Sequence, residues 1–355
     1  MATVRGCHMV GSVPLADTET VFRTCISGMP NRLKRIPDGE TGPRNYFVYF
    51  QSLLWPKAIQ PEIELNVLPK ARDFSEEEYV EGLRLLEATE LKTGYDDAAI
   101  ASYEVFRRLK KDGVLPRDMR FLVCMTTLGN VVGAYVERAF QPRAEKMYEA
   151  ALFQALRNIQ DRIPPGELAI QLDMSVEMLY WEGKWAEPWW SDRSYMVDYL
   201  SRMANQVDKD VEFGLHFCYG DMEHKHVAEP ESLQGVADFA NSILDKCGRP
   251  ASFLHCPVAL SAIDRLDDYF RPLETLVPRL RRDGTELYLG LVHAGDMECT
   301  RRMVEAASKV APEFGVATEC GWGRTPADHL ESIMEISTAV SEPFPEYTSK
   351  ETSGA

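Results

Sequence analysis

The sequence predicts an α/β fold of the (β/α)₈, or TIM, barrel class. Short apolar runs alternate with longer amphipathic stretches along nearly all of the 355 residues. The short runs are rich in Val, Leu, Ile and Phe, and several are apolar throughout, which is typical of parallel strands covered on both faces. A doubly wound open sheet is the alternative with the same alternation, but no glycine-rich GxGxxG turn follows the first run to favour it.

Eight apolar runs are the expected strands. They span residues 4–10, 33–38, 120–126, 168–173, 211–218, 252–256, 286–292 and 315–318. Because amphipathic segments separate them, we expect the strands to lie parallel and to close into a barrel surrounded by helices.

Seven amphipathic stretches are expected to be helices. They span residues 75–91, 144–161, 194–208, 230–246, 262–276, 298–310 and 326–340. The first opens with Ser75 and three acidic residues, a pattern that indicates a helix N-terminus because the serine oxygen can accept a bond from a free backbone N–H.

Two segments exceed a minimal barrel. Residues 50–113, between the second and third strands, carry extra helix and a candidate hairpin. Residues 180–195, after the fourth strand, hold four tryptophans and form either a lid or an apolar loop packed on the barrel mouth. Without an internal repeat or a linker, residues 1–348 are expected to be one catalytic barrel and residues 349–355 a flexible polar tail.

Composition and charge limit the function classes. The chain has 39 Lys and Arg against 55 Asp and Glu residues, a net charge of −16. Such a surface repels phosphates, so neither nucleic acid nor a membrane surface is an expected partner. No apolar run reaches bilayer length, and the N-terminus lacks a signal-peptide pattern. The eight cysteines include no CxxC pair. We therefore expect a cytoplasmic protein without disulfides.

Chemically active residues stand where the expected strands end, which is where the active site of such a barrel lies. They are Gly11, Ser12, Glu40, Asp173, His216, Cys218, His255, Cys256, His293 and Cys320. His216 and Cys218 are two residues apart in one strand and so share a face. A single such residue is more often core packing, but imidazole and thiol groups recurring at one rim favour a zinc site with an open position for catalysis.

These residues resemble the C-terminal catalytic barrel of the cobalamin-independent methionine synthase family, from Cys7 to about Thr325. His-Met-Val-Gly-Ser-Val-Pro, which contains Gly11 and Ser12, resembles the family's T-x-I-G-S-F-P, whose backbone holds the amino-acid substrate. Asp-Gly-Glu-Thr-Gly-Pro-Arg-Asn, which contains Glu40, resembles H-G-E-x-x-R-N. Gln-Leu-Asp, ending at Asp173, resembles Q-I-D-E-P. The resemblance implies that both acids bind the substrate amine.

The resemblance also implies a metal site. His-Phe-Cys-Tyr, which begins at His216, resembles the family's H-M-C-Y. Cys320-Gly resembles the start of C-G-L-K-T-R. The implied Zn²⁺ ligands are therefore His216, Cys218 and Cys320. Where the family has a further glutamate ligand, this sequence has His255 followed by Cys256; either could ligate, and His255 is taken as the fourth ligand. His293 matches the histidine of D-I-H that delivers a proton.

The predicted function is zinc-dependent alkyl (methyl) transfer to a thiol such as homocysteine or a related amino thiol. His293 and Asp173 are the predicted catalytic residues, and Gly11, Ser12, Glu40, Asp173 and Trp322 are expected to bind substrate. The family's N-terminal folate-binding half has no counterpart here, so the expected alkyl donor is not folate. The alternatives are a zinc-dependent lyase or hydrolase of a specialised metabolite on the same barrel and, last, a non-catalytic zinc protein with four protein ligands.

Overall fold

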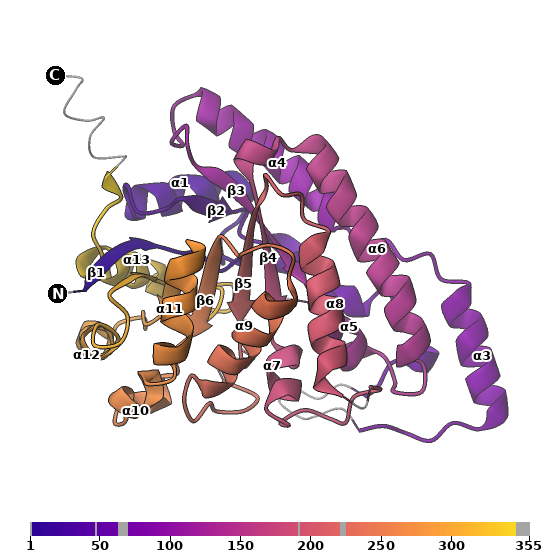
Figure 1. Cartoon of the computed structure of the whole chain (residues 1–355). Helices are drawn as coiled ribbons and strands as arrows, with labels where there is room; N and C mark the ends of the chain where they lie inside the picture. Colours follow the sequence, from indigo (N-terminus) through magenta and orange to yellow (C-terminus); the bar gives the residue numbers. More distant parts are fainter. Residues whose placement is uncertain (1, 47, 63–69, 191, 221–224, 346–355) are drawn as a thin grey trace.

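The computed structural model describes residues 2–46, 48–62, 70–190, 192–220 and 225–345. Within them, eight parallel strands form one sheet in the order β1-β8-β7-β6-β5-β4-β3-β2 (Figure 1). The strands are β1 Thr3–Cys7, β2 Arg35–Pro37, β3 Arg120–Thr126, β4 Leu168–Met174, β5 Glu212–Phe217, β6 Phe253–Pro257, β7 Glu286–Gly290 and β8 Glu313–Val316. The predicted α/β barrel class and its eight strands are confirmed, with boundaries that differ by a few residues.

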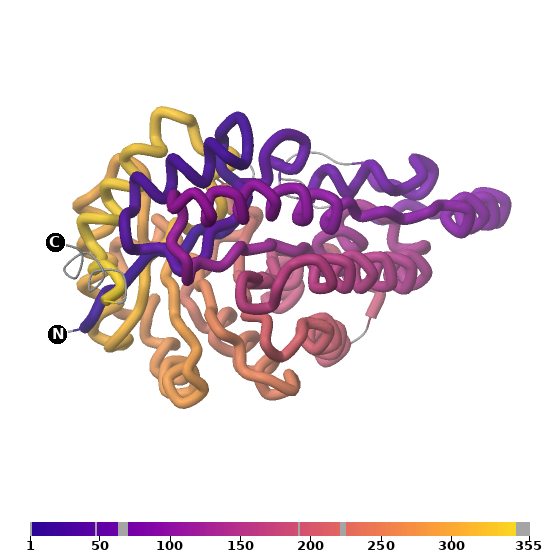
Figure 2. The backbone as a smooth tube through the Cα atoms, turned by 90° about the horizontal axis from the view of Figure 1, so that it is seen from above, coloured from indigo at the N-terminus to yellow at the C-terminus, as the bar shows by residue number. Residues whose placement is uncertain are grey.

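Helices cover the outside of the sheet (Figures 1 and 2). The longer ones are α1 Thr18–Gly28, α3 Glu76–Glu87, α4 Tyr95–Lys111, α6 Gln141–Arg162, α8 Arg193–Asn205, α9 Gln234–Lys246, α11 Leu273–Asp283, α12 Met297–Ala307 and α13 Leu330–Val340. Shorter ones are α2 Tyr49–Ser52, α5 Leu128–Tyr135, α7 Val176–Trp181 and α10 Leu266–Phe270. Ser75 caps α3 as predicted, because its side chain accepts from the backbone of Glu78 while the Glu78 carboxylate accepts from the backbone of Ser75.

Two predictions for the segments between the strands need correction. The helix expected over residues 262–276 is broken into α10 and α11, because Pro272 has no N–H with which to continue the first helix. The insertion between β2 and β3 holds α2, α3 and α4, and its described residues contain no strand of the candidate hairpin. Residues 63–69 of this insertion and the tail at 349–355 lie outside the described residues.

The tryptophan-rich segment after β4 packs on outer helices. The Trp181 ring stacks on Phe239 of α9 at a centroid distance of 4.7 Å. Trp189 Nε1 donates to the Glu145 carboxylate of α6 over 2.8 Å, and the Tyr195 hydroxyl donates to the same carboxylate. These contacts anchor the segment on α6 and α9.

Strand register sets the layers inside the barrel. Asp173 of β4 pairs with His216 of β5, His216 pairs with His255 of β6, and His255 pairs with Tyr288 of β7. Because side chains alternate along a strand, residues in register point to the same face. One aspartate, two histidines and one tyrosine therefore form a layer within the barrel. Beneath it lies a small apolar cluster of Leu122, Cys124, Ala169 and Phe253, which Tyr288 also contacts.

The amino ends of the strands are joined by a network of charges. Arg35 is buried and bonds to Glu286 at 2.8 Å and to Glu212. Lys34 contacts Glu286 at 2.6 Å, and Arg120 contacts Glu212 at 3.0 Å. These residues begin β2, β3, β5 and β7 or directly precede them. The network therefore closes the end of the barrel opposite the strands' carboxyl ends.

The barrel has a seam between its first two strands. Among the described residues β1 and β2 form no ladder with each other, and a bridge joins Cys7 of β1 to Leu33, two residues before β2. Beside it, the Glu342 N–H donates to the Val4 carbonyl at 2.8 Å, and the Gly6 N–H donates to the Glu342 carbonyl at 2.9 Å. The Phe344 ring lies over Gly6, where an added Cβ would come within 2.1 Å of it. We call residues 341–344 the seam segment, because they fill this gap in the wall.

Among the residues that the structure describes, no helix combines the length and the apolar character needed to cross a bilayer.

Candidate metal centre

His216, Cys218 and Cys320 come together at the carboxyl ends of β5 and β8. Their nearest ligand atoms all lie within 4.8 Å of one another. The two sulfurs are 3.6 Å apart, and Cys320 Sγ is 4.0 Å from His216 Nε2. His216 and Cys218 are buried, whereas Cys320 is partly exposed toward the barrel mouth. We call these three residues the His-Cys-Cys cluster.

The donor set and its spacing fit a zinc ion. With Zn–S bonds of about 2.3 Å and a tetrahedral angle, two thiolate sulfurs lie about 3.8 Å apart, and a sulfur and an imidazole nitrogen about 3.6 Å apart. The observed separations of 3.6 Å and 4.0 Å differ from these values by a few tenths of an ångström. Thiolate and imidazole are also the ligands that Zn²⁺ prefers. The cluster therefore has the donor atoms of three corners of a tetrahedral site, and the two separations that involve Cys320 are close to its spacing.

Local structure explains how these side chains are held. His216 and Cys218 share a face because they are two residues apart, and the Cys218 N–H donates to the Met174 carbonyl of β4 over 2.9 Å. Thr318 Oγ1 donates to the Cys320 carbonyl at 2.6 Å, which fixes the turn after β8. The Arg324 guanidinium donates to Cys320 Sγ over 3.7 Å, a contact that favours the thiolate.

The structure places His255 outside the cluster. Its Nδ1 lies 2.7 Å from Nδ1 of His216, and its Nε2 lies 3.0 Å from the Thr318 carbonyl oxygen. Both ring nitrogens are thus engaged with protein atoms, and the prediction of His255 as the fourth ligand does not fit this geometry. Burial lowers the pKa of His255 to about 3, and burial together with His255 holds that of His216 well below its usual value. Cys256 is also fully buried and lies outside the cluster.

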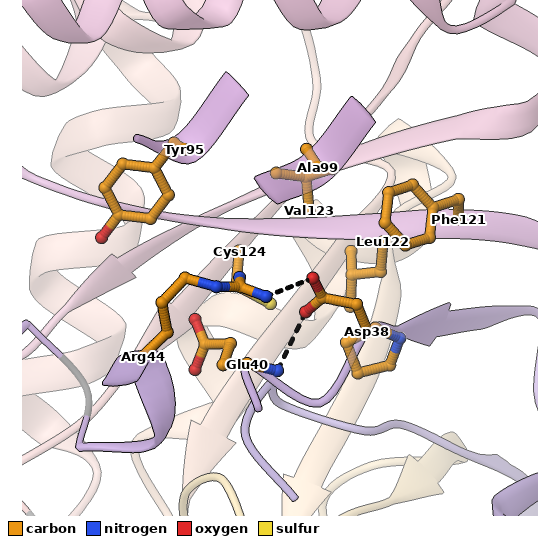
Figure 3. Close-up of a pocket in the computed structure, with 10 residues that line it drawn as sticks. Asp38, Glu40, Arg44, Tyr95, Ala99, Phe121, Leu122, Val123 and Cys124 are labelled. Carbon is orange, nitrogen blue, oxygen red and sulfur yellow. Dashed lines mark hydrogen bonds and ion pairs between the residues drawn. The ribbon is translucent and has the colours of Figure 1, made fainter. Parts of the chain in front are cut away.

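Glu40 occupies a tight turn after β2 (Figure 3). Its backbone φ is 47°, in the left-handed region that non-glycine residues rarely adopt. Asp38 stabilises the turn, since its carboxylate accepts from the Glu40 N–H at 2.9 Å and from Arg44 at 2.6 Å. Burial, partly offset by the charge of Arg44 and reinforced by that of Asp38, raises the pKa of the Glu40 carboxyl to about 7.

Asp173 is a second buried carboxyl close to the first. Burial, followed by the charge of Glu40, raises its pKa well above the usual value. Gln171 Nε2 donates to Asp173 Oδ1 over 2.7 Å, and Gln171 Oε1 accepts from His8 Nε2 over 2.7 Å. Two buried carboxyls, one of which raises the pKa of the other, are suited to binding a cation, because a positive group between them would relieve the repulsion.

Gly11, Ser12 and Trp322 lie beside this carboxyl pair. A Cβ on Gly11 would lie 3.3 Å from Glu40 Oε2, so the Gly11 backbone is exposed directly to that carboxylate. Ser12 is tied to the β8 loop, since its carbonyl accepts from the Trp322 N–H over 2.7 Å. The buried Trp322 indole donates to Thr318 Oγ1 over 2.9 Å. The structure thus brings these predicted substrate-binding residues to the same rim as the metal cluster.

His293 faces a carboxylate that the sequence reasoning did not single out. Glu319, the residue before Cys320, lies 3.6 Å from His293 Nδ1 and 2.8 Å from His226 Nε2. Burial lowers the pKa of His293 despite Glu319. For His226, Glu319 and Glu229 outweigh burial and raise the pKa to about 9. Glu319 thus joins two histidines beside the cluster; the only sequence signal was its position next to Cys320.

Comparison with known proteins supports the fold and nothing finer. No family model matches the sequence, and no curated protein matches it. The structure is similar to a crystal structure named as a candidate vitamin-B12-independent methionine synthase from Listeria monocytogenes. The TM-score is 0.51 at 13% sequence identity, and the match covers 96% of this chain and 99% of that one. At this identity the two proteins share a fold, and the chemistry of this chain has to be argued from its own residues.

Proposed function

We propose that the protein is a zinc-dependent transferase that moves an alkyl group, such as methyl, onto the sulfur of a small amino thiol such as homocysteine. The observation that carries the proposal is the His-Cys-Cys cluster at the carboxyl ends of the strands, where barrels of this class have their active sites. Three protein ligands leave one position of a tetrahedral ion for a substrate, which is the arrangement of catalytic rather than structural zinc.

His216, Cys218 and Cys320 would hold the ion. Bound there, Zn²⁺ would lower the pKa of a substrate thiol, so that the nucleophilic thiolate is available near neutral pH. The cluster is mostly buried, which limits the access of water as a competing nucleophile.

The remaining rim residues would orient the two substrates. Glu40 and Asp173 would bind the ammonium group of the thiol substrate, since both are buried with raised pKa values and the charge of Glu40 contributes to the shift of Asp173. The Gly11 and Ser12 backbone would contact its carboxylate. His293 would exchange a proton with the leaving group at Nε2, which is buried and has no hydrogen-bond partner among the described residues, while Nδ1 faces Glu319.

Metal analysis with matched variants tests the ligand assignment. Purified wild-type protein is expected to hold one zinc per chain, and Cys320→Ala and His216→Ala to lose it while keeping their circular dichroism spectra. Cys256→Ala is the matched control, because Cys256 is a buried strand-end thiol outside the cluster. Stoichiometric zinc in Cys320→Ala, or its loss in Cys256→Ala, would contradict the assignment.

Thiol dependence tests the reaction class. Transfer requires that product appear only when a thiol acceptor is present, and X-ray absorption should show one additional sulfur on the metal when homocysteine is added. Product formation with a methyl donor in the absence of any thiol would contradict transfer and favour a lyase or hydrolase.

A further inference from the structure

We propose that His255 is a positioning residue that selects the tautomer of His216, so that the Nε2 lone pair of His216 is free to bind the metal. The inference rests on the proposed zinc site and adds a residue that contributes no ligand atom to it. His255 occupies the layer position directly beside His216, across the β5–β6 register.

The direction of each hydrogen bond follows from one fixed point. The Thr318 carbonyl oxygen can only accept, so the 3.0 Å contact places a proton on Nε2 of His255. A neutral imidazole carries one proton, and Nδ1 of His255 is therefore an acceptor. The 2.7 Å contact between the two Nδ1 atoms then requires His216 to donate from Nδ1. His216 is left with a lone pair on Nε2, the atom that lies 4.0 Å from Cys320 Sγ.

The surroundings keep His255 in its neutral form. Its side chain is fully buried, and the His8 ring lies at a centroid distance of 6.0 Å. A second proton would place a positive charge inside the barrel next to two other imidazoles, which burial and like charge both disfavour. We call the two hydrogen bonds, from His216 to His255 and from His255 to the Thr318 carbonyl, the relay. The relay therefore has one stable arrangement, which leaves the Nε2 lone pair of His216 at the metal position.

A neutral partner has an electrostatic consequence. Metal-bound histidines usually donate their other N–H to a carboxylate, a carbonyl or water, and a carboxylate would add negative charge behind the ligand. Here the partner is an uncharged ring that donates in turn to a peptide group. Zinc bound by two thiolates and one imidazole would be formally neutral. Because His255 is uncharged, it would add no negative charge that weakens the attraction of the zinc ion for an incoming thiolate.

Two substitutions at His255 separate hydrogen bonding from packing. In His255→Asn, the Oδ1 atom can still accept from Nδ1 of His216, whereas His255→Phe keeps a planar ring and removes the acceptor. We expect zinc affinity, measured by chelator competition, to fall about 10- to 100-fold in His255→Phe and to stay within a few-fold of wild type in His255→Asn. His8→Phe is the control, because it makes the same change at a buried histidine that bonds to Gln171 instead of His216.

Three outcomes of the zinc-affinity measurements would contradict the proposal or its specificity. Equal loss of affinity in the Asn and Phe variants would overturn the proposal, since it would indicate a direct ligand or a packing role for His255. Unchanged affinity in both variants would overturn it as well. A loss in His8→Phe as large as that in His255→Phe would show a general effect of altering the barrel interior.

A measurement without metal keeps the inference distinct from the proposed function. Long-range ¹H–¹⁵N spectra of ¹⁵N-histidine-labelled, metal-free protein distinguish the two neutral tautomers. His216 is expected to carry its proton on Nδ1 in the wild type and in His255→Asn, and to change toward the other tautomer in His255→Phe. A wild-type His216 protonated on Nε2 would overturn the proposal even if zinc binds. The expected tautomer in a protein that fails to bind zinc would instead sustain the relay and refute the zinc function.

Discussion

At the scale of single residues, burial shifts the pKa values of groups at the carboxyl ends of the strands in opposite directions. Burial raises the pKa of Glu40 to about 7 and lowers that of His255 to about 3, so each tends toward its neutral form. For His255 the neutral form is the functional one, because it relays the tautomer of His216. For Glu40 the neutral form belongs to the protein without substrate, and a bound ammonium group would favour the ionised carboxylate.

The raised pKa of Glu40 predicts a pH dependence for substrate binding. The carboxylate attracts an ammonium group only when ionised, and its charge is lost as the pH falls through about 7. We expect kcat/KM for an amino thiol to decline about tenfold per pH unit below that point. Glu40→Gln should lower kcat/KM at pH 8 and remove this acidic limb. A thiol without an amine is the control; the same acidic limb with that thiol would contradict the assignment to Glu40.

Much of the cluster could be predicted from the sequence, because its members stand at strand ends. His216 and Cys218 are spaced for one face of a strand, and Cys320 follows another strand of the same barrel. The role of His255 could not be predicted, since a strand-end histidine is equally placed to be a ligand or a partner. Only the distances to His216 and Thr318 separate those roles. Glu319 was missed because its contacts with two histidines depend on loop geometry.

At the scale of elements, the strands were easier to predict than the helices. β4 is buried at every residue, and such a continuous apolar run has few alternatives in a chain of alternating elements. The helix pattern over residues 262–276 concealed a break, because the apolar period continues across Pro272 while the hydrogen bonds do not. α1 was not predicted, although its start is defined by Asp17, whose side chain accepts from the Thr20 N–H.

The charge network that joins the amino ends of β2, β5 and β7 predicts a stability effect. Arg35 is buried and contacts both Glu212 and Glu286, so removing it would take from each carboxylate its buried partner. We expect Arg35→Met to lower the free energy of unfolding by about 3–5 kcal/mol in urea titrations at pH 7. Arg107→Met is the control, because its partner Glu104 is exposed and such pairs contribute about 0–1 kcal/mol. A loss in Arg35→Met no larger than the control's would contradict this account.

The same network predicts how stability changes in acid. Although burial opposes it, Arg35 and Lys34 lower the pKa of Glu286 from 4.5 to about 2. A lowered native pKa stabilises the fold above the unfolded value, and that contribution is lost as the pH falls from about 4.5 toward 2. Wild-type unfolding free energy should therefore decline over this interval, and the decline should be smaller in Glu286→Gln. Identical acid profiles for the two proteins would argue against the contribution of Glu286.

At the scale of the whole molecule, the barrel wall is continuous except at β1 and β2. The seam segment bonds to β1 on one side, and Phe344 donates from its N–H to the Asn31 carbonyl on the other at 2.9 Å. β1 and the seam segment accordingly lie on the same side of the molecule in both views, and α3 lies at the far end (Figures 1 and 2).

Removing the Phe344 ring should open this seam. The side chain is buried against Gly6, so Phe344→Ala is expected to lower the free energy of unfolding by about 3–5 kcal/mol. Amide hydrogen exchange should quicken first in β1, before it does in β4. Leu53→Ala is the control, because that apolar side chain is 69% exposed. Equal effects of the two substitutions, or exchange that quickens uniformly, would contradict a local role for Phe344.

The seam also governs when the protein can finish folding during its synthesis. Six of the eight strands, β3 to β8, can pair with a neighbour already made, but the wall beside β1 lacks its filling until residues 341–344 have left the ribosome. Until then β1 presents unpaired peptide groups, which are a template for association with other nascent chains. Mutations or translational pauses that delay the seam segment should therefore lengthen the period of chaperone dependence more than equivalent delays between β3 and β7.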